Sequence, residues 1–358
     1  MEDIKEPLNV LVCGTNFGRV YIKGIQKNKK FRIAGILSHG SEQSKRIAKE
    51  YNVPLYTDID KISKREFDLA CVVVRSTVVG GKGSSIANEL LCKGIDVIQE
   101  HPVHYNDLIQ AIKLARKNDC IYQVNSFYPF IKSVGRFIEL SNKALAIGQP
   151  LYIDASCSLQ VLFPMIDIFG RALGGFSPWV FQNIESGESG LPFSILTGKI
   201  KDIPIILKIQ NQIDPADPDN NGFLLHRVII GTTEGTLNLT DSNGQVQWNP
   251  QMYVPHNSEG VLDMYGDNHY LNLHVSEEVP DIHIGQYREV YENVWPSGIS
   301  VMLDNFIKIK ADKRQRELQT QRLLTASKIW REIAEAIGNP QFIKTPDRKG
   351  ISLSEIDR

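Results

Sequence analysis

The first 125 residues alternate apolar runs with amphipathic segments, and this alternation restricts the possible folds more than any other feature of the chain. The apolar runs lie at 8–13, 32–37, 69–74, 96–99 and 121–124. They are apolar throughout rather than at every second residue, which is the pattern of strands buried on both faces of a parallel sheet. Segments with helical spacing lie between them, at 18–27, 44–51, 85–93 and 107–117. The sequence therefore predicts a doubly wound α/β domain.

The pattern changes after residue 128. One helix is expected at about 134–145, and segments with β patterning follow at 203–209, 223–230 and 235–239. A polar turn over 214–222 joins two of these strands, which are most simply antiparallel. A last helix over 314–337 ends at Gly338, and we expect it to pack back on the first domain.

The chain has 358 residues, which exceeds the usual size of one domain. We expect an N-terminal Rossmann domain over 1–127 and a C-terminal α+β domain over 128–358. The second domain should contain a large, mostly antiparallel sheet, with one face buried and the other free for a helix or a partner subunit.

Charge and composition exclude several classes of protein. The net charge is −1 with no cluster of Lys and Arg, which removes the main argument for binding nucleic acid. No apolar run is long enough to cross a bilayer, and the acidic start MEDIKEPLN lacks the form of a secretory signal. The five cysteines are dispersed and the histidines lack metal-ligand spacing, so we expect reduced thiols and no metal. A cytoplasmic enzyme is the expectation.

A short glycine loop follows the first predicted strand. It consists of Gly14, Thr15, Asn16, Phe17 and Gly18, and a helix is expected directly after it. Strand, glycine loop and helix together place phosphate groups on a helix N-terminus, so these residues are candidates for binding a dinucleotide. The spacing is shorter than G-x-G-x-x-G, and a simple tight turn at Gly14 is the alternative.

The end of the second strand indicates which dinucleotide is bound. An Asp or Glu usually holds the ribose of NAD there, but this chain has no acid before Glu42. It offers instead small and hydroxyl-bearing residues, which we assign to the cofactor: Ser38, Gly40, Ser41, Ser44. Hydroxyl groups and the nearby Lys45 and Arg46 suit a 2′-phosphate, which favours NADP(H). The alternative for the two cations is a solvated helix face.

The strand expected at 69–74 is followed by Arg75, Ser76 and Thr77, ahead of a glycine-rich run. Ligands of doubly wound folds lie beyond the carboxyl ends of the strands, so we assign these three residues to the cofactor site. Arg75 capping loop carbonyls is the alternative.

The run Glu100-His101-Pro102 closes the next strand, and Tyr128 follows the strand after it. We assign Glu100 to the cofactor site and predict that His101 and Tyr128 are catalytic. An imidazole and a phenol are both competent proton donors. Taken separately, each side chain has a structural alternative, packing for Tyr128 and a buried histidine for His101.

These motifs together resemble a known family. The first domain resembles the glucose-fructose oxidoreductase, inositol dehydrogenase and rhizopine-catabolism (Gfo/Idh/MocA) family. Four runs are more closely similar to the thiazolinyl imine reductases of siderophore assembly: CGTNFGRVY, VVVRSTVVGGKG, VIQEHPVH and VNSFYP. The resemblance spans about residues 10–129, and beyond residue 150 it rests on architecture alone.

The resemblance implies an activity, a cofactor and a partner. Such enzymes use NADPH to reduce the C=N bond of a thiazoline to a thiazolidine, on a substrate tethered to a carrier domain of a nonribosomal peptide synthetase. His101 and Tyr128 fall on the positions proposed there as proton donors or positioning groups. Members of the family commonly dimerise through the open sheet face, so a homodimer is expected.

Two departures from the wider family point away from alcohol oxidation. The lysine of its Glu-Lys-Pro triplet is His101 here, and the histidine of its Asp-x-x-x-His pair is Arg171, four residues after Asp167. The role of Asp167, catalytic or structural, stays open. Two other functions also stay open: a sugar or polyol dehydrogenase, which free sugars would reveal, and a non-catalytic NADP-binding regulator, which would bind cofactor without hydride transfer.

Overall fold

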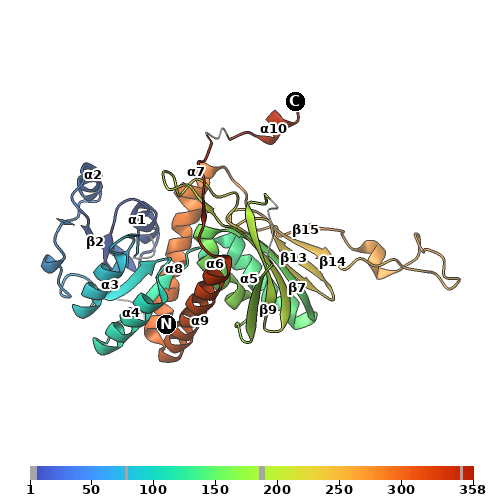
Figure 1. Ribbon diagram of the computed structural model, residues 1–358, viewed down its shortest axis with the longest axis horizontal. Coiled ribbons are helices and arrows are strands. Elements are labelled where there is room, and N and C mark those ends of the chain that lie inside the picture. The colour runs from blue at the N-terminus through green and yellow to red at the C-terminus, as the bar shows by residue number, and fades with distance from the viewer. Residues whose placement is uncertain (1–5, 77–79, 185–189, 347–349) are drawn as a thin grey trace.

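A computed structural model describes residues 6–76, 80–184, 190–346 and 350–358 (Figure 1). Within them, the N-terminal strands form a six-stranded parallel sheet in the order β3-β2-β1-β4-β5-β6. The strands are β1 (Leu8–Cys13), β2 (Phe31–Leu37), β3 (Leu55–Tyr56), β4 (Leu69–Val72), β5 (Asp96–Glu100) and β6 (Tyr122–Asn125). The helices are α1 (Gly18–Gln26), α2 (Glu42–Glu50), α3 (Gly83–Cys92) and α4 (Tyr105–Lys117). The predicted doubly wound domain is confirmed.

A second sheet of eight strands, counted over the described residues, has the order β15-β14-β13-β12-β7-β10-β9-β8. Its strands are β7 (Pro150–Ser158), β8 (Trp179–Ile184), β9 (Phe193–Ile200), β10 (Ile203–Gln210), β12 (His226–Thr232), β13 (Gly235–Leu239), β14 (Val246–Pro250) and β15 (Glu277–Glu278). Only the β7–β10 pair among the described strand pairs of this sheet is parallel. The prediction of a mostly antiparallel sheet is therefore confirmed.

The polar turn over 214–222 joins strands that are not neighbours. It leads from β10, through the two-residue strand β11 (Gln212–Ile213), to β12. β10 and β12 run in opposite directions as expected, but they lie on either side of β7. The sequence pattern of β10 and β12 could not reveal this insertion, because a third strand between them leaves their own alternation unchanged.

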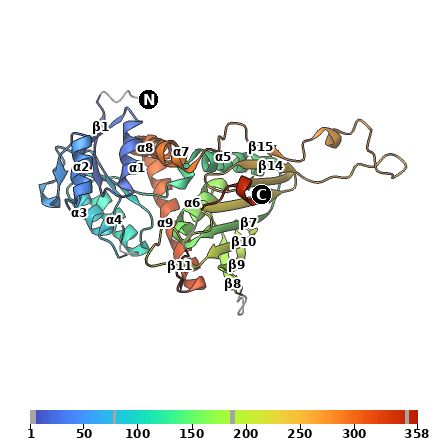
Figure 2. The ribbon, with the colours of Figure 1, turned by 90° about the horizontal axis from the view of Figure 1, so that it is seen from above.

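Helices cover one face of the second sheet. α5 (Lys132–Ile147) lies against β12, β13 and β14, α6 (Leu162–Ala172) against β7, and α9 (Lys313–Ile337) against β8. On β10 the alternate residues Ile203, Ile205 and Leu207 are buried under these helices, whereas Ile206 is 46% exposed on the opposite face. The second sheet therefore has one buried face and one open face, and the views agree on the helical layer (Figure 2).

One helix that the sequence analysis missed, α8 (Trp295–Ala311), packs on α1 of the nucleotide domain and on α9. It packs on α1 so closely that a Cβ on Gly24 would lie 2.5 Å from Ile299 Cβ. Lys310 Nζ is 2.7 Å from Asp96 Oδ2, at the start of β5. The segment begins Trp-Pro-Ser-Gly, and its proline and glycine concealed the helical pattern in the sequence, although proline is well tolerated in a first turn.

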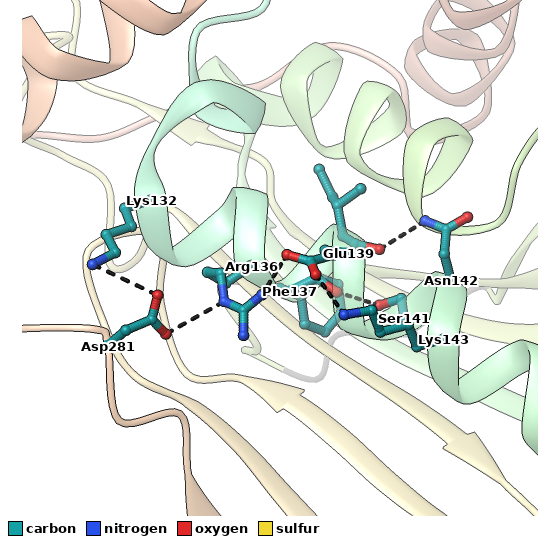
Figure 3. A network of polar contacts seen from close by, with 9 residues as sticks. Lys132, Arg136, Phe137, Glu139, Ser141, Asn142, Lys143 and Asp281 are labelled. Atoms are coloured by element: carbon teal, nitrogen blue, oxygen red, sulfur yellow. Dashed lines mark hydrogen bonds and ion pairs between the residues drawn. The ribbon is translucent and has the colours of Figure 1, made fainter.

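The exposed side of α5 carries a network of ion pairs (Figure 3). Glu139 pairs with Arg136 and with Lys143, and Arg136 also reaches Asp281 at 3.3 Å. These contacts hold the chain near residue 281 against α5. Exposed pairs of this kind add little to stability, because water already solvates both charges.

A second ion cluster is buried between the two sheets. Asp167 of α6 lies 2.9 Å from Arg171 Nε and 3.3 Å from Arg322 Nε of α9, and it accepts a hydrogen bond from the Ser126 hydroxyl after β6. Burial alone would raise the pKa of Asp167, but the two guanidinium groups and Ser126 hold it below its ordinary value. The arginine that replaces the family's histidine is thus the partner of Asp167, which favours the structural role.

We expect Asp167→Asn to lower the free energy of unfolding by about 3–5 kcal/mol, because it leaves two buried arginines without a compensating charge. Since the folded-state pKa of Asp167 is depressed, the stabilisation is present at neutral pH and is lost as the pH falls through that pKa. Urea unfolding at pH 7 measures the change. The exposed variant Glu139→Gln is the matched control and should leave the urea midpoint almost unchanged. Equal effects of the two variants would contradict the assignment.

Candidate active site

The glycine loop passes over the end of β4. Gly14 has φ +92°, and a Cβ at this position would lie 2.5 Å from the Val73 carbonyl oxygen. Its N–H donates to the Leu37 carbonyl at 2.9 Å, which continues the ladder between β1 and β2 to the start of the loop. Gly14 therefore lies in a tight turn that only glycine adopts without strain. Because it has no side chain, a ligand is able to approach the backbone closely at this position.

α1 begins beside this loop with no side-chain cap. Phe17 is its N-cap residue and makes no side-chain capping bond, and Gly18 is buried at the first helical position. Thr15 is nearly buried, and its carbonyl accepts a hydrogen bond from Gln43 at 3.3 Å, whereas Asn16 is exposed. The N–H groups at the start of α1 are thus not bonded by a side-chain cap. Beside them, Gly14 leaves space that a Cβ would fill. This arrangement, the glycine cradle, fits a dinucleotide phosphate.

The residues predicted for the 2′-phosphate separate into two groups. Ser38 is half-buried at the end of β2, Gly40 follows with φ +80°, and Ser41 is exposed and caps α2 through the Ser44 N–H. Ser44 is completely buried, and its hydroxyl donates to the Ser41 carbonyl at 2.8 Å. The structure therefore places Ser44 in the first turn of the helix rather than at the surface.

The residues predicted for the cofactor in the loop after β4 also differ in exposure. Arg75 is 61% exposed, and its guanidinium lies 3.8 Å from Asp219 of the second domain. Ser76 is buried, and its hydroxyl donates to the Pro102 carbonyl at 2.5 Å, which joins the end of β4 to the Glu-His-Pro run. Thr77 lies outside the described residues.

Glu100 ends β5 with 14% of its side chain exposed. Its Oε2 accepts hydrogen bonds from the Tyr21 hydroxyl of α1 and from Asn125 Nδ2, the latter at 3.5 Å. Burial raises the pKa of Glu100 to about 8, although these two donors lower it. The carboxyl group is therefore mostly protonated at neutral pH. Oε1, the carboxyl oxygen that neither Tyr21 nor Asn125 contacts, faces His101 Nε2 at 3.4 Å.

His101 lies in the same buried space, with 10% of its side chain exposed. Burial, assisted by the nearby His226, lowers the pKa of His101 to about 3, so the ring is neutral at neutral pH. From the sequence, either charge state was expected. Nδ1 is buried and has no hydrogen-bond partner among the described residues. A buried ring nitrogen without a protein partner is able to take part in binding a ligand or in moving a proton.

A strained turn directs Tyr128 toward His101. Phe127 has φ +63° and ψ −65°, and the Tyr128 N–H donates to the Ser126 carbonyl at 2.7 Å, which forms a γ-turn. Asn125 Oδ1 holds this turn by accepting the Phe127 N–H at 2.9 Å. Backbone strain of this kind costs about 1–3 kcal/mol and concentrates at functional sites. The ring centroids of Tyr128 and His101 are 6.2 Å apart as a result.

Tyr128 is held from the second domain by His226. The two rings meet edge to face with centroids 4.7 Å apart. His226 Nε2 lies 2.8 Å from the Val161 carbonyl oxygen and Nδ1 2.7 Å from the Ser242 hydroxyl, so Nε2 donates and Nδ1 accepts. Burial lowers the pKa of His226 to about 4, and burial also raises the pKa of Tyr128. His226 is thus a neutral, fixed support for the phenol.

An aromatic wall closes the site on the side of α8. The Trp295 ring lies 5.8 Å from the Phe17 ring and 5.4 Å from the Phe127 ring, and Tyr291 packs edge to face on Trp295 at 4.9 Å. On the opposite side, the Phe163 ring stacks on His101 at 6.3 Å. The polar groups of the site are therefore enclosed by apolar surface, which explains the shifted pKa values of Glu100 and His101.

The structure brings some predicted residues together and leaves others apart. Glu100, His101 and Tyr128 share one buried space, and Phe17 joins the glycine loop to it. Four other predicted residues are not part of this buried group and lie partly or fully exposed after β2 and β4: Ser38, Gly40, Ser41 and Arg75. The sequence analysis missed several residues of the site: Tyr21, Asn125, Phe163, His226 and Trp295. Asn125 could have been found from its place at a strand's carboxyl end, but His226 had no local signal.

Two further properties concern the described residues. No group of three or more acidic, histidine or cysteine side chains is arranged there to hold a metal ion. No helix in the described ranges combines the length and apolarity needed to cross a membrane.

Comparisons with known proteins agree with this architecture. Residues 8–126 match the oxidoreductase family with an NAD-binding Rossmann fold (Gfo/Idh/MocA), and residues 148–249 match the C-terminal domain of Irp3-like thiazolinyl imine reductases. A search of curated proteins finds no match.

Solved structures share the fold at low sequence identity. A putative myo-inositol dehydrogenase from Sinorhizobium meliloti is 11% identical with a TM-score of 0.63, and the alignment covers 92% of this chain and 97% of that one. Biliverdin reductase from Synechocystis, solved with biliverdin and NADP+, is 14% identical with a TM-score of 0.60, covering 92% and 99%. An Agrobacterium radiobacter oxidoreductase, solved with NAD+, L-tartaric acid and magnesium, is 12% identical with a TM-score of 0.64, covering 92% and 96%.

The chain has the fold of the Gfo/Idh/MocA oxidoreductases. The two family matches support an oxidoreductase that uses a nicotinamide dinucleotide. The glycine cradle, the uncapped helix and the unpartnered Nδ1 of His101 fit that cofactor.

We expect Gly14→Ala to weaken binding of the nicotinamide dinucleotide at least ~10-fold, because the new methyl group collides with the Val73 carbonyl and displaces the loop. Fluorescence titration of NADPH measures the affinity. Gly174→Ala is the matched control, since Gly174 also has positive φ (+67°) but opens onto free space. Wild-type affinity in a folded Gly14→Ala protein would overturn the assignment of the cradle.

Proposed function

We propose that this protein reduces the C=N bond of a thiazoline to a thiazolidine, using NADPH, on a substrate held as a thioester on a carrier domain. The observation that carries the proposal is the composition of the site. A histidine whose Nδ1 has no hydrogen-bond partner among the described residues stands where sugar dehydrogenases of the same fold have a lysine. A carboxyl group whose pKa is raised by burial lies 3.4 Å from its Nε2. The match of residues 148–249 to Irp3-like thiazolinyl imine reductases supports the same substrate class.

The chain's own residues supply a proton to the ring nitrogen. The bound cofactor would supply a hydride to the ring carbon, and the nitrogen must gain a proton as this occurs. In the proposed relay, His101 Nδ1 gives its proton to the nitrogen while His101 Nε2 takes the proton from Glu100 Oε1. The imidazole stays neutral throughout, which suits a pKa of about 3. Glu100 ends as a carboxylate and the ring proton lies on Nε2. Before the next turnover a proton from solvent enters at Nδ1 and Nε2 returns its proton to Glu100, which restores both groups.

Tyr128 has a positioning role in this scheme. Its pKa is raised by burial, so its hydroxyl remains protonated and can donate a hydrogen bond to the substrate. The γ-turn and His226 fix its ring, and no described residue hydrogen-bonds its hydroxyl. A hydroxyl donor without a protein partner is well suited to bind a polar group of the substrate.

The proposal includes NADP(H) rather than NAD(H). No carboxylate ends β2, and Glu42, the first acid after it, is paired with Lys45 Nζ at 2.7 Å. Ser38, Ser41 and the exposed Arg46 remain available for a 2′-phosphate. We also propose that the protein is a homodimer and that its transient partner is a synthetase carrier domain.

We expect the purified protein to oxidise NADPH when given a thiazoline thioester surrogate, with a product that has gained two hydrogens. NADPH should be turned over faster than NADH. Absorbance at the NADPH band and product mass, followed together, measure the reaction. Free inositols and sugars are the control substrates, and turnover with these alone would favour a polyol dehydrogenase instead. Cofactor binding without any gain of hydrogen would overturn the proposal.

We expect the rate of the wild-type enzyme to fall as the pH rises through about 8, because Glu100 then loses the proton that feeds His101. His101→Ala should lower kcat by ~10²–10⁴-fold, the usual contribution of a general acid. Glu100→Gln should lower kcat and also remove the decline above pH 8, while Tyr128→Phe should raise KM more than it lowers kcat. Glu139→Gln, far from the site, is the control. An unchanged pH profile in Glu100→Gln would rule out the relay.

A further inference from the structure

Tyr21 of α1 is completely buried beside Glu100. Its hydroxyl donates a hydrogen bond to Glu100 Oε2 and accepts one from Asn125 Nδ2 at 2.6 Å. Asn125 Oδ1 in turn accepts the Phe127 N–H, which holds the turn before Tyr128. A single hydroxyl group therefore contacts both the end of β5 and the end of β6.

The ring of Tyr21 lies against the glycine loop. Its centroid is 6.3 Å from the centroid of Phe17, edge to face, and Phe17 is the N-cap residue of α1. The helix whose N-terminus fits a dinucleotide phosphate therefore also carries the hydroxyl group that bonds the buried carboxyl group.

The bond from Tyr21 differs in strength between the two protonation states of Glu100. Burial and the nearby Glu100 raise the pKa of Tyr21, so its hydroxyl stays protonated and acts as a donor. A carboxylate accepts such a bond more strongly than a neutral carboxyl group does. Asn125 polarises the hydroxyl in the same direction, because it donates to the hydroxyl oxygen. The arrangement thus stabilises Glu100 most after Glu100 has given up its proton.

The titratable groups that face Glu100 come from several elements. They are Tyr21 of α1, Cys71 of β4, His101 after β5 and Tyr128 after β6. Burial raises the pKa of Cys71 and of Tyr128 and lowers that of His101, so these three groups are uncharged at neutral pH. Of the hydrogen-bond donors described around the carboxyl group, Tyr21 and Asn125 are those that oppose the effect of burial on its pKa.

A second buried tyrosine of the same sheet has a different kind of partner. Tyr122 of β6 is 8% exposed, and its hydroxyl donates to Gln99 Oε1 at 2.7 Å. Strand alternation places this pair on the opposite face of the sheet from Glu100 and Asn125. Gln99 is an amide whose charge does not change, so its bond to Tyr122 serves the fold alone. The bond from Tyr21 ends on a group that changes charge in the proposed reaction.

We propose that Tyr21 is a positioning residue of the proton relay: its hydroxyl orients Glu100 so that Oε1 faces His101, and it stabilises the carboxylate that remains after the transfer. The inference rests on the proposed function, because it takes Glu100 as the group that supplies His101. The O–H bond of Glu100 Oε1 breaks as an N–H bond forms at His101 Nε2. Tyr21 transfers no proton and keeps its hydroxyl hydrogen in both states.

The first test removes only the hydroxyl group. Tyr21→Phe retains the ring against Phe17 and should keep the wild-type affinity for NADPH. We expect kcat for thiazoline reduction to fall ~10-fold or more, because a hydrogen bond to a charged group is lost. The decline of the rate above about pH 8 should move to higher pH by about one unit, because the Glu100 carboxylate loses a stabilising donor.

The direction of this shift separates the inference from a purely structural role. A loosened site would admit water, which solvates the carboxylate and moves the decline to lower pH. Tyr122→Phe is the matched control: it should reduce the urea midpoint about as much as Tyr21→Phe does, and leave the pH profile unchanged. A decline that stays in place or moves to lower pH in folded Tyr21→Phe would overturn the proposal, and so would an equal shift in Tyr122→Phe.

The second test needs no substrate. Infrared difference spectroscopy of the NADP+-bound protein follows the band of the protonated carboxyl group against pH, and Glu100→Gln identifies this band by its loss. We expect a midpoint at about pH 8 in the wild type and about one unit higher in Tyr21→Phe. This upward shift without thiazoline reduction would support the role of Tyr21 and overturn the proposed reaction. An unchanged or lower midpoint would overturn the role of Tyr21 whatever the substrate.

Discussion

The candidate site depends on one constraint, which is that parallel strands all present their carboxyl ends at the same edge of the sheet. β1, β4, β5 and β6 end there in the glycine loop, Ser76, Glu100 and Asn125 respectively. The direct contacts between these ends, Ser76 to the Pro102 carbonyl and Asn125 to Glu100, hold the edge together. The reacting groups are thus positioned by backbone that is itself fixed by the ladder of strand hydrogen bonds.

The second domain converts this edge into a site by removing water from it. Phe163 and His226 enclose His101 and Tyr128, and the aromatic wall of α8 encloses Phe17 and Phe127. Desolvation disfavours charge on both an acid and a base, so the same burial raises the pKa of Glu100 and lowers that of His101. The outcome is a neutral pair in which the proton resides on the carboxyl group, the reverse of an ordinary ion pair in water.

Burial acts differently on Asp167, which lies close to this site. Two guanidinium groups compensate its charge, and the pKa is lowered rather than raised. The two carboxylates therefore have opposite roles: Glu100 lacks a cation and stores a proton, whereas Asp167 is fully paired and joins α6 to α9.

The sequence by itself determined the parallel sheet, the glycine loop, the strand ends that carry Glu100, His101 and Tyr128, and the helix over 314–337. These features follow from local periodicity and from residues a few positions apart, so a single segment contains all the information. The tertiary structure alone decided the insertion of β7 between β10 and β12, the packing of α8 on α1 and the approach of His226 to Tyr128. It also decided that Ser44 is buried, that Asp167 pairs with Arg322, and that His101 is neutral. Each of these depends on contacts between distant segments, or on the exclusion of water by such contacts. The spacing of neighbouring residues predicts neither the contacts nor the exclusion of water.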